Sequence, residues 1–124
     1  MPPIVIAARC PWTDTGIDLV VGTRFRMHAT GTWHDRQFPS SPVGIPPQNI
    51  VQRLFVPFLR FPNGRYMTLI GCIDQDADTA FAIGEAVEIT ASRSGRLWCY
   101  ANDVRGAYGN NSGSVELFVD RVTT

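Results

Sequence analysis

The stretch YANDVRGAYGNNSGSV, residues 100–115, carries more side-chain oxygen than a turn requires. Calcium in proteins takes about six to eight oxygen ligands from carboxylates, amides and carbonyls. Asp103, Asn110 and Asn111 supply three side-chain oxygens, and Gly106 and Gly109 would let a carbonyl of the intervening backbone turn inward. The spacing is therefore that of a calcium site with one charged ligand. A glycine-rich hairpin with asparagines at left-handed turn positions explains the same composition equally well.

A cation held by a single carboxylate keeps coordination positions open for water or for the hydroxyls of a ligand. Amide groups at its edge suit a neutral polyhydroxyl compound better than an anion. If the loop binds calcium, we therefore expect its ligand to be a sugar-like molecule.

A second acidic stretch, DQDADTAFAIGE, places Asp74, Asp76, Asp78 and Glu85 at the ligand spacing of an EF-hand loop. Thr79 stands where that loop needs glycine, and strand-like segments flank the stretch where an EF-hand has helices. We expect an acidic hairpin, with a weak additional cation site as the alternative.

The chain offers little that resembles a catalytic centre. Its two histidines, His28 and His34, lie on or just past one predicted strand, and no nucleophile elbow or metalloprotease motif is present. No carboxylate pair is singled out by spacing. We expect a protein that is not an enzyme.

The 124 residues suffice for one domain, residues 1–124, with a single core. A formal net charge of zero provides no overall field to attract nucleic acid or an anionic membrane, so neither is an expected partner. The N-terminus lacks a signal-peptide pattern and no apolar run reaches membrane-spanning length, so neither secretion by that route nor membrane insertion is expected. These features favour a cytoplasmic location, with non-classical release to the cell exterior left open.

Three widely spaced cysteines, Cys10, Cys72 and Cys99, form neither a disulfide framework nor a zinc motif. They are interpreted as small buried apolar residues, with a Cys72–Cys99 bridge as the alternative. Trp12 is interpreted as a core residue, with a stacking platform as its alternative.

Alternation of apolar and polar residues dominates the chain and predicts strands buried on one face. The clearest examples are RFRMHATGTW, AVEIT and SVELFVDRV. Further expected strands are PIVIAA, DLVVG, LFVPFLRF, YMTLIGCI, TAFAIG and RLWCYA. No helical stripe is convincing, so the predicted fold is all-β, an antiparallel, jelly-roll-like β-sandwich. Residues 34–53, with four prolines, form a long and stiffened loop typical of functional segments.

The segment NDVRGAYGNNSGSVELFV resembles the C-terminal motif of the PA-IL-like family, the calcium-dependent galactose-binding bacterial lectins. That family's pattern is Asn-Asp-Val-Pro-Gly-Thr-Tyr-Gly-Asn-Asn-Ser-Gly-Ser, from which this chain departs at Arg105 and Ala107. GTRFRMHATGTW and LIGCI are similar to two of the family's strands.

The resemblance implies a small β-sandwich in which calcium bridges the protein to two hydroxyls of a galactose-type sugar. It implies side-chain calcium ligands and backbone carbonyl ligands, the former from Asp103, Asn110 and Asn111, the latter from Ala107 and Asp35. Sugar contacts would come from Asp103, Asn110 and Asn111, with Val104 lining the sugar. It also implies a homo-oligomer, because lectins gain avidity by multivalency.

Two departures from the family bear on the sugar. The family holds the exocyclic hydroxymethyl group with a histidine and a glutamine three residues later, and the corresponding region here has no histidine. Gln48 is the expected substitute, with Gln52 as the alternative. Arg105 replaces a proline and adds a cation at the rim, which could favour an acidic sugar.

The sequence therefore predicts calcium-dependent binding of galactose-type or related glycans. The alternative is a calcium-stabilised structural or interaction domain that has lost sugar recognition; calcium would then raise stability, since it binds the folded state only.

Overall fold

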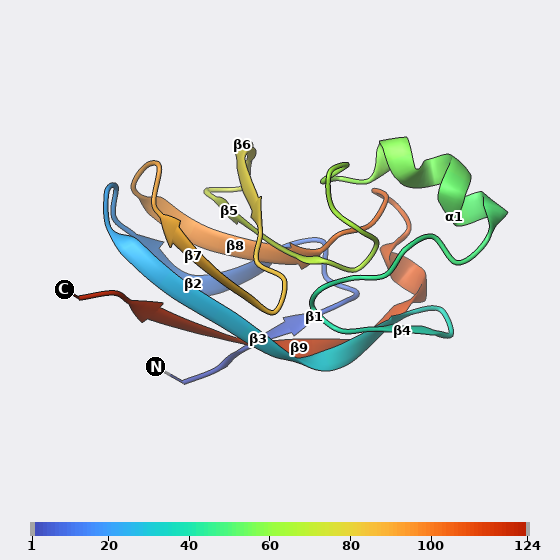
Figure 1. Ribbon diagram of the computed structural model, residues 1–124, viewed down its shortest axis with the longest axis horizontal. Coiled ribbons are helices and arrows are strands. Elements are labelled where there is room, and N and C mark those ends of the chain that lie inside the picture. The colour runs from blue at the N-terminus through green and yellow to red at the C-terminus, as the bar shows by residue number, and fades with distance from the viewer. Residues whose placement is uncertain (1, 124) are drawn as a thin grey trace.

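Two antiparallel β-sheets packed face to face make up the protein, as a computed structural model describing residues 2–123 shows (Figure 1). One sheet has the order β1-β9-β3-β4, and β7 pairs with another part of β3. Its strands are β1 (Ile4–Ala7), β3 (Arg24–Asp35), β4 (Phe38–Ser40), β7 (Ala86–Thr90) and β9 (Asn111–Arg121). The other sheet has the order β2-β8-β5-β6 and comprises β2 (Thr13–Leu19), β5 (Leu69–Ile73), β6 (Asp76–Ala82) and β8 (Gly95–Ala101). The predicted all-β antiparallel sandwich is confirmed.

The longest pairing joins β3 to β9, from Phe25 opposite Arg121 to Asp35 opposite Asn111. Both strands alternate as the sequence predicts, because every second residue of each points into the sandwich. A one-residue slip would turn all of these apolar side chains towards solvent, so the buried face determines the register. That register places the last residue of β3 opposite the first residue of β9.

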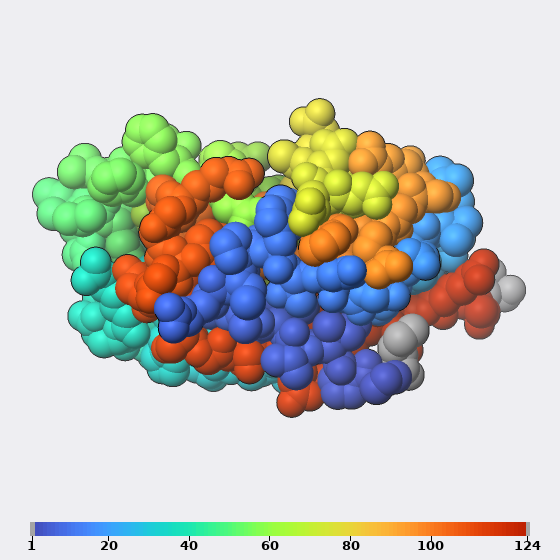
Figure 2. All heavy atoms as spheres, turned by 180° about the vertical axis from the view of Figure 1, so that it is seen from behind, coloured from blue at the N-terminus to red at the C-terminus, as the bar shows by residue number. Residues whose placement is uncertain are grey.

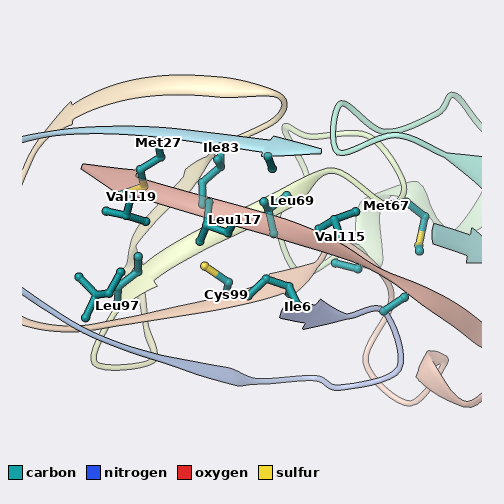
Figure 3. Close-up of a cluster of buried hydrophobic side chains, with 14 of the residues drawn as sticks. Ile6, Met27, Met67, Leu69, Ile83, Leu97, Cys99, Val115, Leu117 and Val119 are labelled. Carbon is teal, nitrogen blue, oxygen red and sulfur yellow. The ribbon is translucent and has the colours of Figure 1, made fainter. Parts of the chain in front are cut away.

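The core fills the space between the two sheets (Figure 3). Met27, Leu117 and Val119 from the first sheet face Leu69 and Leu97 from the second, each at most 1% exposed. Burial of such side chains is the main stabilising contribution to a domain of this size. It makes the sandwich a rigid platform for the loops at its ends.

One predicted strand is wrong, because residues 54–58 of LFVPFLRF are helical and only Leu59 forms an isolated β-bridge, to Val104. The structure has a short α-helix, α1 (Ile50–Phe55), followed by a 3₁₀ turn, η1 (Val56–Phe58). The side chain of Asn49 caps α1 by accepting a hydrogen bond from the backbone N–H of Gln52 at 2.8 Å. Pro57 cannot donate to a sheet ladder, which works against a strand here.

Two other predicted strands begin or end elsewhere. DLVVG contains only the end of β2, since Val20 and Val21 lie exposed in the turn before β3. YMTLIGCI becomes a strand only at Leu69, because Met67 has a left-handed φ of 67° that interrupts extended backbone.

The acidic stretch at 74–85 forms the β5–β6 turn, strand β6 and the beginning of the turn that leads to β7. Asp74 and Gln75 both have positive φ, as a tight two-residue hairpin turn requires. Asp76 forms an ion pair with Arg93 at 2.8 Å and accepts a hydrogen bond from the backbone N–H of Asp78 at 2.9 Å. Within residues 2–123, no cluster of three or more His, Cys, Asp or Glu side chains is placed to hold a metal ion.

All three cysteines are free, and the interpretation of them as buried holds for only two. Cys72 and Cys99 are buried in the second sheet, where loss of solvation raises the pKa of each thiol, that of Cys72 to about 11. Cys10 is exposed instead, because it lies in the turn that follows β1.

Trp12 is half-buried and lies outside the core. Its indole packs edge-on against Tyr100 and Trp98, with ring centroids 5.3 and 6.3 Å away. The guanidinium of Arg60 lies 4.4 Å from the Trp12 ring centroid and 3.5 Å from that of Tyr100. Trp12 therefore contributes to an aromatic cluster on the second sheet, and the interpretation of it as a core residue is wrong.

The long segment between β3 and β5 gathers at one end of the sandwich, where α1 projects from the body (Figure 1). Seen from behind, the same segment forms a bulge at the end of the molecule away from the C-terminal end of β9 (Figure 2). No helix among residues 2–123 is long and apolar enough to cross a membrane.

Candidate functional site

A pocket of about 460 Å³ opens at the end of the sandwich from which α1 projects. Its walls come from the end of β3, from α1 and from the loop between β8 and β9. The residues that line it are Asp35, Arg36, Gln37, Phe38, Asn49, Val51, Gln52, Phe55, Tyr66, Asp103, Val104, Ala107 and Asn110.

The β3–β9 pairing brings the predicted site residues of two distant segments together. Asp35, the last residue of β3, lies opposite Asn111, the first residue of β9. Just beyond them, the backbone N–H of Arg36 donates to the carbonyl of Asn110 at 3.0 Å. The oxygen-rich loop is therefore held against the end of β3, as the predicted participation of both segments in one site requires.

Asp103 is 2% exposed, and its carboxylate is bonded only to neutral groups. It accepts a hydrogen bond from the backbone N–H of Val104 at 2.7 Å and one from the side-chain amide of Asn111 at 3.0 Å. Loss of solvation outweighs these bonds and raises the pKa of Asp103 to about 6, and the nearby charge of Asp35 adds to this shift. The site holds a carboxylate for which a cation would be a favourable partner.

Asn111 provides an oxygen without any hydrogen-bond partner. Its amide nitrogen donates to the carboxylate of Asp103 and, at 3.2 Å, to the carbonyl of Ala8, whereas its buried Oδ1 is unpaired. A buried acceptor left unpaired is costly, so such atoms are rare in folded proteins. Amide and carboxylate oxygens are the donor types that calcium prefers, and the pair supplies one of each. Asn111 turns its amide nitrogen towards Asp103 and does not itself line the pocket.

A second buried carboxylate, that of Asp35, also lines the pocket. Gln52 donates its side-chain N–H to Asp35 at 2.8 Å, while burial raises the pKa of Asp35. The hydroxyl of Tyr66 donates a hydrogen bond to the backbone carbonyl of Gln52 at 2.6 Å. Burial is the main cause that raises the pKa of Tyr66 to about 12, and the charges of Asp103 and Asp35 add to this shift. Tyr66 therefore stays neutral in a pocket with two acidic groups.

Gln48, the expected substitute for the family's hydroxymethyl contact, does not line the pocket. Its side chain is exposed and donates to the carbonyl of Pro46 at 2.7 Å. Gln52 lines the pocket instead, and so does Asn49 three residues earlier. The sequence Asn49-x-x-Gln52 thus has the spacing of the family's His-x-x-Gln pair, with asparagine in place of histidine. This spacing was the signal that could have identified both residues.

The loop from Asp103 to Asn110 presents only some of its polar residues to the pocket. Val104, Ala107 and Asn110 line the pocket, whereas Arg105 is exposed and points outside the lining. Gly106 has a φ of 86°, and the turn it makes lets the N–H of Ala107 donate to the carbonyl of Val104 at 3.0 Å.

Asn102 has a structural role and lies outside the pocket lining. Its side chain accepts from the N–H of Phe61 and donates to the carbonyls of Phe61 and Arg65, all at 2.9 Å. These bonds tie the loop after η1 to the end of β8. Asn102, the remaining Asn or Asp residue of the stretch 100–115, thereby supports the site without lining it.

No family model matches the chain, and no curated protein matches it in a sequence comparison. Among solved structures, it is similar to one described as "EclA N-terminal domain; PllA-like lectin". The superposition has a TM-score of 0.76 at 17% sequence identity and covers 98% of this chain and 97% of that chain. At this identity the similarity shows a shared fold, that of a lectin-like β-sandwich.

Proposed function

We propose that the protein binds carbohydrate in this pocket in a calcium-dependent manner, with galactose-type sugars as the first candidates. The observation that carries the proposal is the buried pair of Asp103, bonded only to neutral groups, and Asn111, whose side-chain oxygen is unpaired. The lectin-like fold of the similar structure supports the same conclusion.

In this proposal Asp103, Asn110 and Asn111 hold calcium through their side chains, and Ala107 and Asp35 through backbone carbonyls. When bound, calcium would bind sugar hydroxyls directly and polarise them. The carboxylate of Asp103 accepts hydrogen bonds from the same hydroxyls, the amide of Asn110 donates to them or accepts from them, and Val104 packs against the ring. A sugar epimer with one hydroxyl misplaced would leave these polar groups unpaired, which is the physical basis of discrimination.

In this proposal Asn49 and Gln52, which both line the pocket, contact the exocyclic hydroxymethyl group. Both carry amides, so each can donate to and accept from a hydroxyl. In the unbound protein Gln52 already donates to Asp35 and accepts from the N–H of Gln48 at 2.6 Å, so its side chain is held in one orientation. A fixed donor costs little entropy when the sugar binds.

The second candidate is a calcium-stabilised domain without sugar recognition. The observation that favours it is the mutual bonding of Gln52 and Asp35, which satisfies polar groups that a sugar would otherwise contact. Calcium would then raise the melting temperature, and galactose would change nothing further.

Calorimetric titration of chelator-treated protein tests both candidates. We expect heat from calcium, and heat from galactose only once calcium is present. Asp103→Asn keeps the shape of the side chain and should abolish the calcium signal, whereas Asp76→Asn in the β5–β6 hairpin should leave it intact. Calcium heat without a response to galactose or to a glycan array would favour the structural domain, and no calcium heat would refute both. Sedimentation of the same samples tests the expected homo-oligomer.

A further inference from the structure

Helix α1 and turn η1 expose apolar side chains and bury a polar one, the reverse of an ordinary surface helix. The only buried residue of α1 is Gln52. Five large apolar side chains of this segment are between 46% and 72% exposed, and we call them the apolar tip. They are Ile50, Val51, Leu54, Phe55 and Phe58.

The apolar tip projects from the body of the sandwich (Figures 1 and 2). Val51 and Phe55 also line the pocket, so the tip and the pocket mouth are continuous. Phe55 and Phe58 pack against each other with ring centroids 5.9 Å apart. The tip is a convex projection, whereas peptide segments usually bind in grooves. Clustered exposed apolar residues of this kind mark an interaction surface.

The charge of the surrounding chain has a single sign. Residues 36–73 contain four arginines and no Asp or Glu, although the whole chain has a net charge of zero. Arg36 and Arg53 are exposed and form no ion pair with any residue in the range 2–123. The nearest acidic groups of the pocket, Asp35 and Asp103, are buried. The exposed charged side chain of α1 is Arg53 and that of the pocket mouth is Arg36, so both charges beside the apolar tip are cationic.

A symmetric dimer through this surface would place the arginines of one copy against those of the other, because a two-fold interface pairs a surface with itself. An anionic lipid bilayer matches both properties at once. Its interface accepts aromatic and aliphatic side chains, and its headgroups attract arginine.

We propose that the apolar tip docks the protein on an anionic lipid bilayer, with Leu54, Phe55 and Phe58 entering the interface and Arg53 facing the headgroups. The protein would rest on the membrane without crossing it. This inference does not depend on calcium or sugar binding, but the pocket mouth would lie at the membrane surface, where the sugar headgroup of a glycolipid would be presented to it.

Flotation with liposomes tests the proposal in the presence of a chelator and without any sugar lipid. We expect binding to phosphatidylserine-containing vesicles and little binding to phosphatidylcholine alone. The double variant Leu54→Ser/Phe58→Ser should weaken binding about tenfold or more, since apolar burial and charge act together. The matched control is Val20→Ser/Val21→Ser, which removes two exposed apolar residues from the β2–β3 turn at the other end of the molecule. Arg53→Ala should weaken binding and reduce its dependence on salt.

Because all of the substituted side chains are largely exposed, the variants should melt with the parent protein, and a thermal scan checks this. The proposal is overturned if the parent protein does not float with anionic vesicles, or if both double variants lose binding equally. It is also overturned if sedimentation shows an oligomer that the tip variant alone dissociates, because the tip would then be an interface between copies. Failure here leaves the calorimetric result on calcium and galactose unaffected, so the two proposals are separable.

Discussion

The carboxylate of Asp103 accepts a hydrogen bond from the side-chain amide of Asn111 at 3.0 Å, and the remaining oxygen of that amide has no partner. The bond keeps the two side chains together in a buried position at the start of β9. The proposed calcium site rests on this buried carboxylate, which has no cationic partner, and on the unpaired amide oxygen. This arrangement costs stability in the metal-free protein and makes its stability dependent on pH.

The metal-free protein should become less stable as pH rises from about 4 to about 6. Burial raises the pKa of Asp103 from 3.8 to about 6, so in this range the folded state binds a proton that the unfolded state has released. Stability therefore falls with rising pH, by about 2 kcal/mol for this group alone, and the raised pKa of Asp35 acts in the same direction. Urea unfolding in the presence of a chelator, at several pH values, measures this change in the free energy of unfolding.

Asp103→Asn should remove most of this dependence of stability on pH, because the amide does not titrate. Calcium should reverse the trend in the parent protein, since the ion competes with the proton for Asp103 and binds better above pH 6 than below it. A slope that is the same in the parent protein and in Asp103→Asn would contradict the assignment to this residue.

Gln52→Ala should weaken sugar binding by about tenfold while calcium affinity changes little. The substitution removes the donor to Asp35 and the acceptor for the N–H of Gln48, and it leaves the proposed calcium ligands in place. Gln48→Ala is the matched control, because its exposed side chain bonds only to the carbonyl of Pro46. Calorimetry with galactose and calcium on both variants distinguishes them. Equal losses would mean that α1 moves on binding and that the Gln52 geometry of the unbound protein does not select the sugar.

Arg60→Ala should destabilise the fold by about 1–3 kcal/mol. The guanidinium packs on Tyr100 and Trp12 and donates to the carbonyl of Pro11 at 2.6 Å and to the hydroxyl of Tyr108 at 2.8 Å. Its loss would loosen the segment after η1, whose backbone is bonded to the carbonyl of Asp103 at 3.1 Å.

Arg65→Ala is the control for charge, since Arg65 is exposed and forms no ion pair with the described residues. Chemical unfolding followed by tryptophan fluorescence measures both variants. If Arg60→Ala is no less stable than Arg65→Ala, the stacked guanidinium contributes no net stability.

Local pattern determined most of the fold. Alternation in β3, β7 and β9 reflects the burial of one sheet face. A strand buried on one face needs an apolar residue at every second position, and this pattern is visible in the sequence. The oxygen-rich stretch and its glycines likewise singled out Asp103 and Asn111, because both belong to one short stretch of sequence. The arginines between residues 36 and 73 are equally visible in the sequence.

Only the tertiary structure decided which partners those residues have. Asp35 meets Asn111 because the β3–β9 register ends there. Gln52 rather than Gln48 enters the pocket because Asn49 starts a helix inside the segment that the sequence predicted to be a long loop. The helical turn directs Gln52 inward and leaves the apolar residues of α1 outside. Sequence spacing reports the neighbours within one element, whereas distances between elements depend on how the sheets and the loop pack, which no local pattern encodes.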